Sequence, residues 1–364
     1  MQKIIGFVVL TLFWATNFAS AQSHRSYDIT LMASDLDQPW SIGFLPEGGW
    51  LVTLRGGTLR HYNENGQFTQ VGGLPRIRAR GQGGLFDVVV ARDFAQSRTI
   101  FLSYAAKSRG TTGTVLASAK LHKNGRRLTD LVVLFKMTSP TSGGEHFGGR
   151  IVEAQDGTLF LTIGDRGDSE TAQDTNNHNG ALIRVNRDGS VPASNPKLWK
   201  LPEIWSYGHR NPQGAALDQD GQLYVHEHGA RGGDEVNRVN KGANYGWPVI
   251  AYGRHYSGGK IGEGTHKAGM EQPELYWDPS IAPSGFAIHS GNNNQEWAGD
   301  FFVGSLKFNY IARLEMQNGK LVEVEKIESS ETGRVRDVRE APDGSIWFLS
   351  VDKGAAYRLA PKGK

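Results

Sequence analysis

The sequence predicts an all-β fold: a closed six-bladed β-propeller, with loop insertions that form the site on one face. Three observations point to it. A short apolar and aromatic strand recurs six times, a second strand with a basic residue follows each copy, and the chain has 47 glycines and 10% aromatic residues. So many glycines favour tight turns between strands. No stretch of the sequence has the pattern of a long amphipathic helix.

The first recurring strand is four residues long and is usually introduced by an acidic residue or a glycine. Its copies begin at residues 50, 100, 159, 223, 301 and 346, and are therefore 45 to 78 residues apart. Repeats of this length are typical of propeller blades. The six copies are 50–53, 100–103, 159–162, 223–226, 301–304 and 346–349.

The second strand places a basic residue inside an apolar alternation. It follows the copies at 59–60, 119–121, 182–185, 236–239, 311–314 and 356–359. Each repeat leaves room for two further strands, which gives the four strands of a blade. The widest gap holds a Gly-, His- and Tyr-rich insertion at about 242–291. Because long loops on a rigid scaffold often carry binding sites, we expect this insertion to contribute to one.

The N-terminus has the pattern of a secretory signal peptide. Lys3 precedes an apolar run at 4–14, and Ala19-Ser20-Ala21 is a small-residue cleavage site. The run is too short to cross a bilayer of about 30 Å. We therefore expect residues 1–21 to be removed and residues 22–364 to form a single catalytic domain, periplasmic or secreted. A retained membrane anchor is the alternative.

Composition excludes several classes of function. The chain has no cysteine, so neither disulfides nor thiolate chemistry contribute. Its 40 basic and 37 acidic residues give a net charge of +3, far from the basic balance of a nucleic-acid-binding protein. No later segment is long and apolar enough to span a membrane. Any site that binds an anion must therefore arise from a local cluster of basic residues.

His146 is the first candidate for chemistry. Glycine pairs flank it at 143–144 and 148–149, a setting that brings backbone close to a ligand. A base in a cleft is the functional interpretation, and an ordinary surface histidine is the alternative. Gln82 lies in a similar glycine-rich segment at 81–84, which on its own indicates only a turn.

Several cations precede or follow the predicted strands. Arg334 and Arg336 are two residues apart, so a strand would place both on one face, where they require an anion. Two solvated arginines on an edge strand are the alternative. With Lys307 and Arg210, which is followed by Asn211, they give four cations from three blades around the central channel.

The segment 227–237 combines carboxylates with the free carbonyls of a glycine-rich turn. Calcium prefers such oxygen ligands. His226 and His228 suggest a transition-metal pair instead, but no third ligand follows at a convincing spacing. An acidic loop that binds nothing is the remaining alternative.

Taken in order, these motifs resemble those of the soluble pyrroloquinoline-quinone (PQQ)-dependent glucose and aldose sugar dehydrogenases, most closely the periplasmic aldose sugar dehydrogenase branch. The resemblance runs from about Leu36 to the C-terminus. The motifs that carry it are GQGG at 81–84, HFGGR at 146–150, IGD at 163–165, YGHRNPQG at 207–214, GDE at 233–235, NYGWP at 244–248, SLK at 305–307 and RVRDV at 334–338.

The resemblance implies a set of site residues. It makes His146 the general base and assigns PQQ to Gln82, Arg210, Asn211, Tyr256, Lys307, Arg334 and Arg336. The Gly229 and Ala230 carbonyls would hold the calcium that contacts PQQ, and Glu235 with the Tyr245 carbonyl matches a further calcium position. Many relatives have proline at the position of Ala230, which a backbone ligand tolerates.

The implied activity is the oxidation of an aldose at its anomeric carbon to a lactone. His146 would take the hydroxyl proton while a hydride passes to calcium-polarised PQQ. The implied partners are an aldose and an unidentified electron acceptor, in a monomer or a dimer. A calcium-dependent propeller lactonase or hydrolase is one alternative. Such an enzyme would not need several cations that converge on the three carboxylates of PQQ. A non-catalytic sugar-binding propeller is the other, and His146 with the full cation set argues against it.

Overall fold

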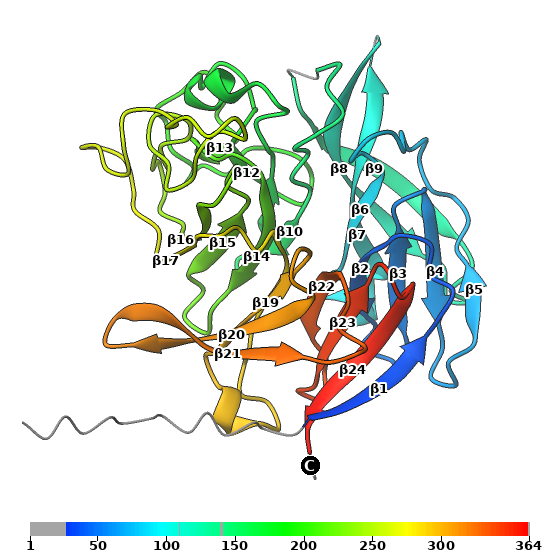
Figure 1. Cartoon of the computed structure of the whole chain (residues 1–364). Coiled ribbons are helices and arrows are strands. Elements are labelled where there is room, and N and C mark those ends of the chain that lie inside the picture. Colours follow the sequence, from blue (N-terminus) through cyan, green and yellow to red (C-terminus); the bar gives the residue numbers. More distant parts are fainter. Residues whose placement is uncertain (1–26, 109, 139–140, 363–364) are drawn as a thin grey trace, which may run out of the picture.

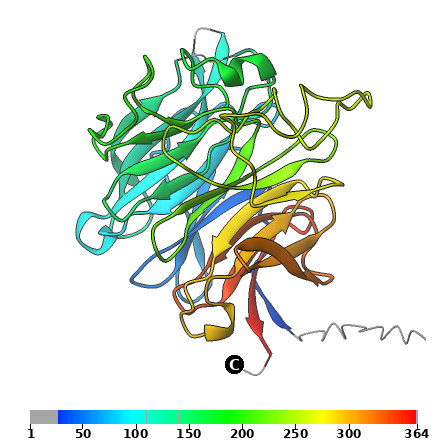
Figure 2. The same ribbon diagram turned by 90° about the vertical axis from the view of Figure 1, so that its left-hand side faces the viewer.

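A computed structural model describes residues 27–108, 110–138 and 141–362. These residues form six four-stranded antiparallel sheets arranged as the blades of a propeller (Figures 1 and 2), which confirms the predicted fold. The predicted signal peptide lies outside the described residues. Among the helices of the described part, none has the length and apolar character needed to cross a bilayer.

Five blades are built from four consecutive strands each. The first holds β2 (Pro39–Phe44), β3 (Trp50–Leu54), β4 (Thr58–Tyr62) and β5 (Phe68–Gln70); the second β6 (Leu85–Val90), β7 (Thr99–Ser108), β8 (Thr111–Leu121) and β9 (Leu128–Lys136); the third β10 (Ile151–Glu153), β11 (Leu159–Thr162), β12 (Leu182–Val185) and β13 (Ile204–Ser206); the fourth β14 (Pro212–Leu217), β15 (Leu223–Glu227), β16 (Asp234–Arg238) and β17 (Leu275–Trp277); and the fifth β18 (Pro283–Ile288), β19 (Phe301–Ser305), β20 (Tyr310–Gln317) and β21 (Lys320–Glu328).

The sixth blade closes the ring with strands from both ends of the described chain. It contains β22 (Val335–Glu340), β23 (Ile346–Ser350), β24 (Ala355–Pro361) and β1 (Tyr27–Ala33). Strand β1 pairs antiparallel with β24, and Tyr27 lies opposite Pro361. Short helical turns occur only in connections of the described chain: α1 (Phe94–Ser97) and the two 3-10 turns Ser169–Gln173 and Gln295–Trp297.

The recurring strands of the sequence have fixed places in the blades. All six copies of the first strand fall in the second strands of the blades, β3, β7, β11, β15, β19 and β23. The strands with a basic residue are the third strands, although the expected segment 236–239 passes the end of β16 by one residue. The basic side chain reaches the fourth strand: Arg60 lies 4.4 Å from the Phe68 ring centre, and Arg313 Nη1 lies 3.2 Å from Glu325 Oε2.

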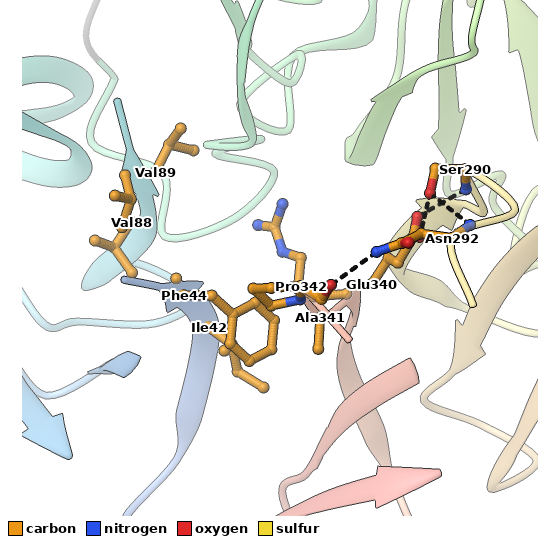
Figure 3. A pocket seen from close by; sticks show the side chains of 12 residues that line it. Ile42, Phe44, Val88, Val89, Ser290, Asn292, Glu340, Ala341 and Pro342 are labelled. Carbon is orange, nitrogen blue, oxygen red and sulfur yellow. Dashed lines mark hydrogen bonds between the residues drawn. The ribbon is translucent and has the colours of Figure 1, made fainter. Parts of the chain in front are cut away.

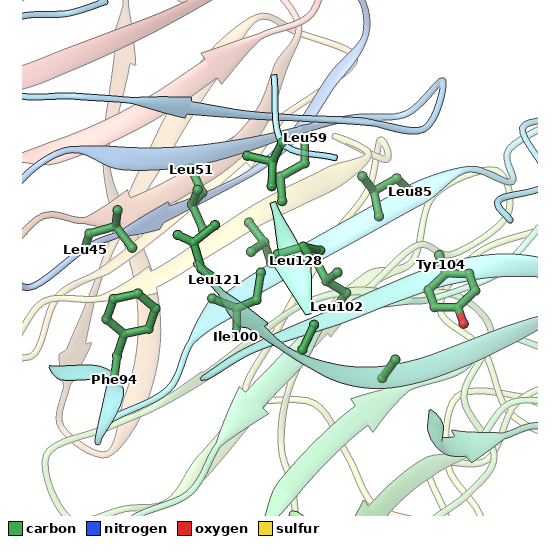
Figure 4. Close-up of a cluster of buried hydrophobic side chains, with 14 of the residues drawn as sticks. Leu45, Leu51, Leu59, Leu85, Phe94, Ile100, Leu102, Tyr104, Leu121 and Leu128 are labelled. Atoms are coloured by element: carbon green, nitrogen blue, oxygen red, sulfur yellow. The ribbon is translucent and has the colours of Figure 1, made fainter. Parts of the chain in front are cut away.

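Apolar clusters join neighbouring blades. The cluster in Figure 4 combines Leu51 and Leu59 of the first blade with Leu85 and Ile100 of the second, and all four are fully buried. Burying one such side chain contributes roughly 1.5–3 kcal/mol. Packing between blades therefore holds the ring together, while hydrogen bonds hold each blade.

The innermost strands approach each other closely around the channel. A Cβ added to Gly285 in β18 would lie 2.0 Å from the backbone nitrogen of Val338 and 2.5 Å from Asp337 Cα in β22. Since backbone cannot yield as a side chain does, only glycine fits at this position.

We expect Gly285→Ala to lower the free energy of unfolding by at least about 1–3 kcal/mol, the usual cost of overpacking a core. Urea denaturation monitored by tryptophan fluorescence measures it. Gly264→Ala is the control, because a Cβ there meets nothing within 4 Å. Equal stability of the two variants would contradict the close approach of β18 and β22.

Candidate active site

A large cavity opens where the innermost strands begin. Its volume is about 1040 Å³. Eight of the residues predicted from the sequence line it: Gln82, Asn211, Gly229, Ala230, Tyr256, Lys307, Arg334 and Arg336. Tyr256 lies at its open side, with 74% of its surface exposed. Four more predicted residues, Arg210, Glu235, Tyr245 and His146, lie beside this cavity in the positions described below.

The cavity is rich in cations. Arg55 and Arg231 line it together with the predicted Lys307, Arg334 and Arg336, whereas Asp278 is the one acidic residue that the described part of the chain places in its lining. Burial, and then the charge of Arg150, lowers the pKa of Arg336 to about 9. A cation held in this way is stabilised by an anion, so the cavity fits a polycarboxylate.

Two glycine-rich loops meet beside the cavity and position His146. Arg55 donates hydrogen bonds to the carbonyls of Gly81 and Gly83. A Cβ on Gly81 would lie 2.4 Å from the carbonyl oxygen of Gly144, so the two loops pack backbone to backbone. Gln82 Oε1 accepts the backbone N–H of His146 at 2.9 Å. This contact requires glycine at position 81, and among the glycines that flank His146, a Cβ on Gly148 would lie 2.5 Å from the carbonyl oxygen of Thr162.

A buried carboxylate orients the His146 ring. Nδ1 of His146 lies 2.6 Å from Oδ1 of Asp165, which is 1% exposed. Trp247 Nε1 donates to the other oxygen, Asp165 Oδ2, at 2.8 Å. Because the carboxylate accepts the proton on Nδ1, Nε2 keeps its lone pair, and the ring is 14% exposed. This arrangement suits a general base.

Sequence reasoning gave no role to Asp165 or Arg55, yet a signal for both exists. Each follows directly or closely on the second strand of its blade, Arg55 after β3 and Asp165 after β11, as His228 follows β15 and Lys307 follows β19. Since the second strand runs antiparallel to the first, its end lies where the innermost strand begins. Polar residues just after these strands therefore point to the site face.

Arg210 lies away from the other predicted cofactor cations. Its guanidinium donates to the carbonyls of His228, at 3.2 Å, and Gly229, and lies 5.3 Å from the centre of the Trp247 ring. The Gly229 carbonyl that the sequence assigns to calcium thus accepts a hydrogen bond from Arg210. Lys307, Arg334 and Arg336 are the predicted cations that line the large cavity.

A second, much smaller cavity of about 20 Å³ lies under Gly229 and Ala230. Glu227, Glu235 and Tyr245 also line it, and about 10–15 Å³ is enough for one water-sized ligand. Burial, and then the charge of Glu227, raises the pKa of Glu235 to about 8. Asn237 Oδ1 is buried without a hydrogen-bond donor. Two close carboxylates and an unsatisfied oxygen fit a calcium ion.

The structure argues against a transition-metal pair at His226 and His228. Nε2 of His226 lies 3.3 Å from the Gly285 carbonyl oxygen, and Nε2 of His228 lies 2.7 Å from that of Pro283. Burial lowers the pKa of His226 to about 3 and that of His228 to about 4. Within the described residues, no three His, Cys, Asp or Glu side chains gather as metal ligands.

A buried ionic network forms the floor below the site. Arg150 pairs with Asp87 at 3.2 Å and with Asp337 at 3.0 Å, and Arg339 pairs with the same two carboxylates at 2.6 and 3.1 Å. The two arginines and two aspartates balance in charge. The Trp40 ring covers the network, with its centre 4.4 Å from the Arg150 guanidinium. The network fills the channel between its two ends.

The opposite end of the channel holds a different pocket, of about 400 Å³, shown in Figure 3. It is lined by the last residues of the innermost strands, among them Ile42, Phe44, Val88 and Val89. Its Glu340 already accepts hydrogen bonds from Ser290. This pocket lacks the converging cations and the oriented histidine of the large cavity.

Comparison with known proteins gives one consistent family. The glucose/sorbosone dehydrogenase family model matches residues 36–358. Aldose sugar dehydrogenase YliI of Escherichia coli K12 is 40% identical over 345 residues, covering 92% of this chain and 93% of that protein. Quinoprotein glucose dehydrogenase B of Acinetobacter calcoaceticus is 29% identical over 331 residues, covering 82% and 67%. The crystal structure of the soluble aldose sugar dehydrogenase of E. coli in its apo-form superposes with a TM-score of 0.88 at 39% identity, covering 93% of this chain and 100% of that one.

Proposed function

The chain belongs to the glucose/sorbosone dehydrogenase family, and from this we propose that it oxidises aldoses to lactones with PQQ and calcium. One observation carries the proposal: the large cavity places a carboxylate-oriented histidine beside a cluster of cations. The signal peptide predicted at residues 1–21 supports export of the enzyme.

The cavity residues fit a quinone with three carboxylates. Lys307, Arg334 and Arg336 would bind carboxylates through charge-assisted hydrogen bonds, and the planar guanidinium groups would do so in pairs of contacts. Asn211 and Gln82 supply neutral polar contacts at the same walls. The relative named as a quinoprotein supports a cofactor of this kind.

The carbonyls and carboxylates fit calcium. Gly229 and Ala230 border both cavities, so their carbonyls would hold an ion in contact with the cofactor once Arg210 releases Gly229. Glu235 and the Tyr245 carbonyl would hold a further ion in the small cavity. Bound calcium would offset both causes of the raised pKa of Glu235, its burial and then the charge of Glu227.

His146 would move the proton of the reaction. When bound, calcium-polarised PQQ supplies an acceptor for two electrons. The free Nε2 of His146 takes the proton of the anomeric hydroxyl, and Asp165 stabilises the imidazolium that forms. Trp247, through its hydrogen bond to Asp165, keeps this pair in place.

Reconstitution tests the proposal. We expect purified apo-protein to bind PQQ only with calcium present, and then to reduce an artificial electron acceptor when an aldose is added. Chelation before loading should abolish both quinone binding and turnover.

The controls separate the alternatives. Apo-protein, and protein given calcium alone, should be inactive in the same assay. Hydrolysis of lactones by calcium-loaded protein without PQQ would favour the lactonase instead. Quinone-loaded protein that is inactive towards a full panel of aldoses would refute the proposal.

A further inference from the structure

A separate hollow of about 170 Å³ lies next to the large cavity and shares the wall formed by Gly81 and Phe147. Arg78 and Arg80 line it from the connection between β5 and β6, and Lys107 lines it from β7. None of these three side chains belongs to the proposed cofactor site.

The charged side chains that line the hollow are all positive. Within the described residues, Arg78, Arg80 and Lys107 form no ion pair, and none of the ten residues that line the hollow is acidic. Some other arginines of the fold do form ion pairs, as Arg98 does with Glu47 and Arg313 with Asp300. Three unpaired cations around one concave space favour an anionic ligand.

The backbone of the hollow also favours an anion, because its carbonyl oxygens already accept hydrogen bonds. Arg166 donates to the carbonyls of Thr112, at 3.3 Å, and Gly143, at 2.9 Å. The N–H of Gln82 donates to the Gly144 carbonyl at 2.7 Å. By contrast, the N–H groups of Gly143 and Gly144 meet no acceptor in the described part of the chain. Successive free N–H groups are a common feature of anion sites.

We propose that this hollow binds the oxyanion group, a phosphate, sulfonate or carboxylate, of a small molecule whose other end lies in the large cavity. Gly144 lines the hollow, and His146 follows it on the same loop, so one molecule can reach both. The group belongs either to an anionic aldose or to an anionic electron acceptor. The assignment of the reacting end rests on the proposed function. Binding of the anion in the hollow does not.

Binding is tested first, on apo-protein and without turnover. Calorimetric titration with inorganic phosphate and with glucose 6-phosphate should show binding, with a Kd at least about tenfold higher in an Arg80→Gln/Lys107→Gln double variant. The matched control, Lys123→Gln/Arg126→Gln, removes two cations from an exposed turn and should bind like the original protein. No binding, or equal binding by all three proteins, would overturn the proposal.

Kinetics of the quinone-loaded enzyme then identifies the source of the anion. If it is the sugar, glucose 6-phosphate has a lower KM than glucose with a neutral quinone as acceptor, and the double variant removes the difference. If it is the acceptor, the double variant raises the KM of a sulfonated quinone acceptor but not that of the neutral quinone. If the double variant alters neither KM, the hollow has no role in the reaction. Inactivity towards all sugars would refute the proposed function, while the titrations would still decide on the anion site.

Discussion

His146→Gln should lower kcat of the quinone-loaded enzyme by roughly 10²- to 10⁴-fold, the usual loss when a general base is removed. Glutamine has similar bulk and forms hydrogen bonds, but it cannot take the proton of the anomeric hydroxyl. The assay is aldose-dependent reduction of an artificial acceptor, with quinone absorbance confirming equal occupancy. A variant that turns over like the original enzyme would show that His146 is not the base.

Asp165→Asn provides a second route to the same conclusion. An amide N–H facing Nδ1 would shift the ring proton to Nε2, the atom that must accept the substrate proton. We therefore expect a large loss of kcat although His146 is intact. A loss for His146→Gln but not for Asp165→Asn would mean that the negative charge of Asp165 is not needed to keep the proton on Nδ1.

Arg336→Ala should weaken PQQ binding by at least about tenfold, because a lost charged partner costs about 1.5–3 kcal/mol. Arg336 is partly buried, its Nη2 donates to Gln213 Oε1 at 3.0 Å, and its guanidinium lies 4.9 Å from the Trp40 ring centre. It is thus already in place to meet a carboxylate, and binding needs little reordering.

The measurement is a titration of apo-protein with PQQ at fixed calcium, followed by absorbance. Arg126→Ala, on an exposed turn, is the matched control and should retain the original Kd. Circular dichroism of both variants checks that the propeller is intact. An unchanged Kd for Arg336→Ala would remove this arginine from the cofactor site.

The sequence predicted the parts of this molecule that leave a local pattern. The second and third strands of every blade were predicted because their apolar pattern repeats along the chain. His146 was predicted because close backbone packing requires glycines around it. Strand alternation predicted that Arg334 and Arg336 lie together, and both line the cavity, but Arg334 precedes β22, which begins at Val335.

Contacts between distant segments could not be predicted in this way. Asp165, in the connection between β11 and β12, meets His146, in the connection between β9 and β10, and β1 joins β24 from the far end of the chain. The network of Asp87, Arg150, Asp337 and Arg339 draws on three blades, and each residue alone resembles an ordinary polar position in a strand. Only the closed ring brings such groups within hydrogen-bond distance.

Closure of the ring by β1 and β24 also sets the order in which the protein can mature. Arg334 and Arg336 belong to the closing blade, whose four strands exist together only after Pro361 has been synthesised. A nascent chain can complete the first five blades earlier, but it has no finished cofactor cavity. We therefore expect the proposed cofactor to be loaded late in biogenesis, after the last blade has captured the N-terminal strand.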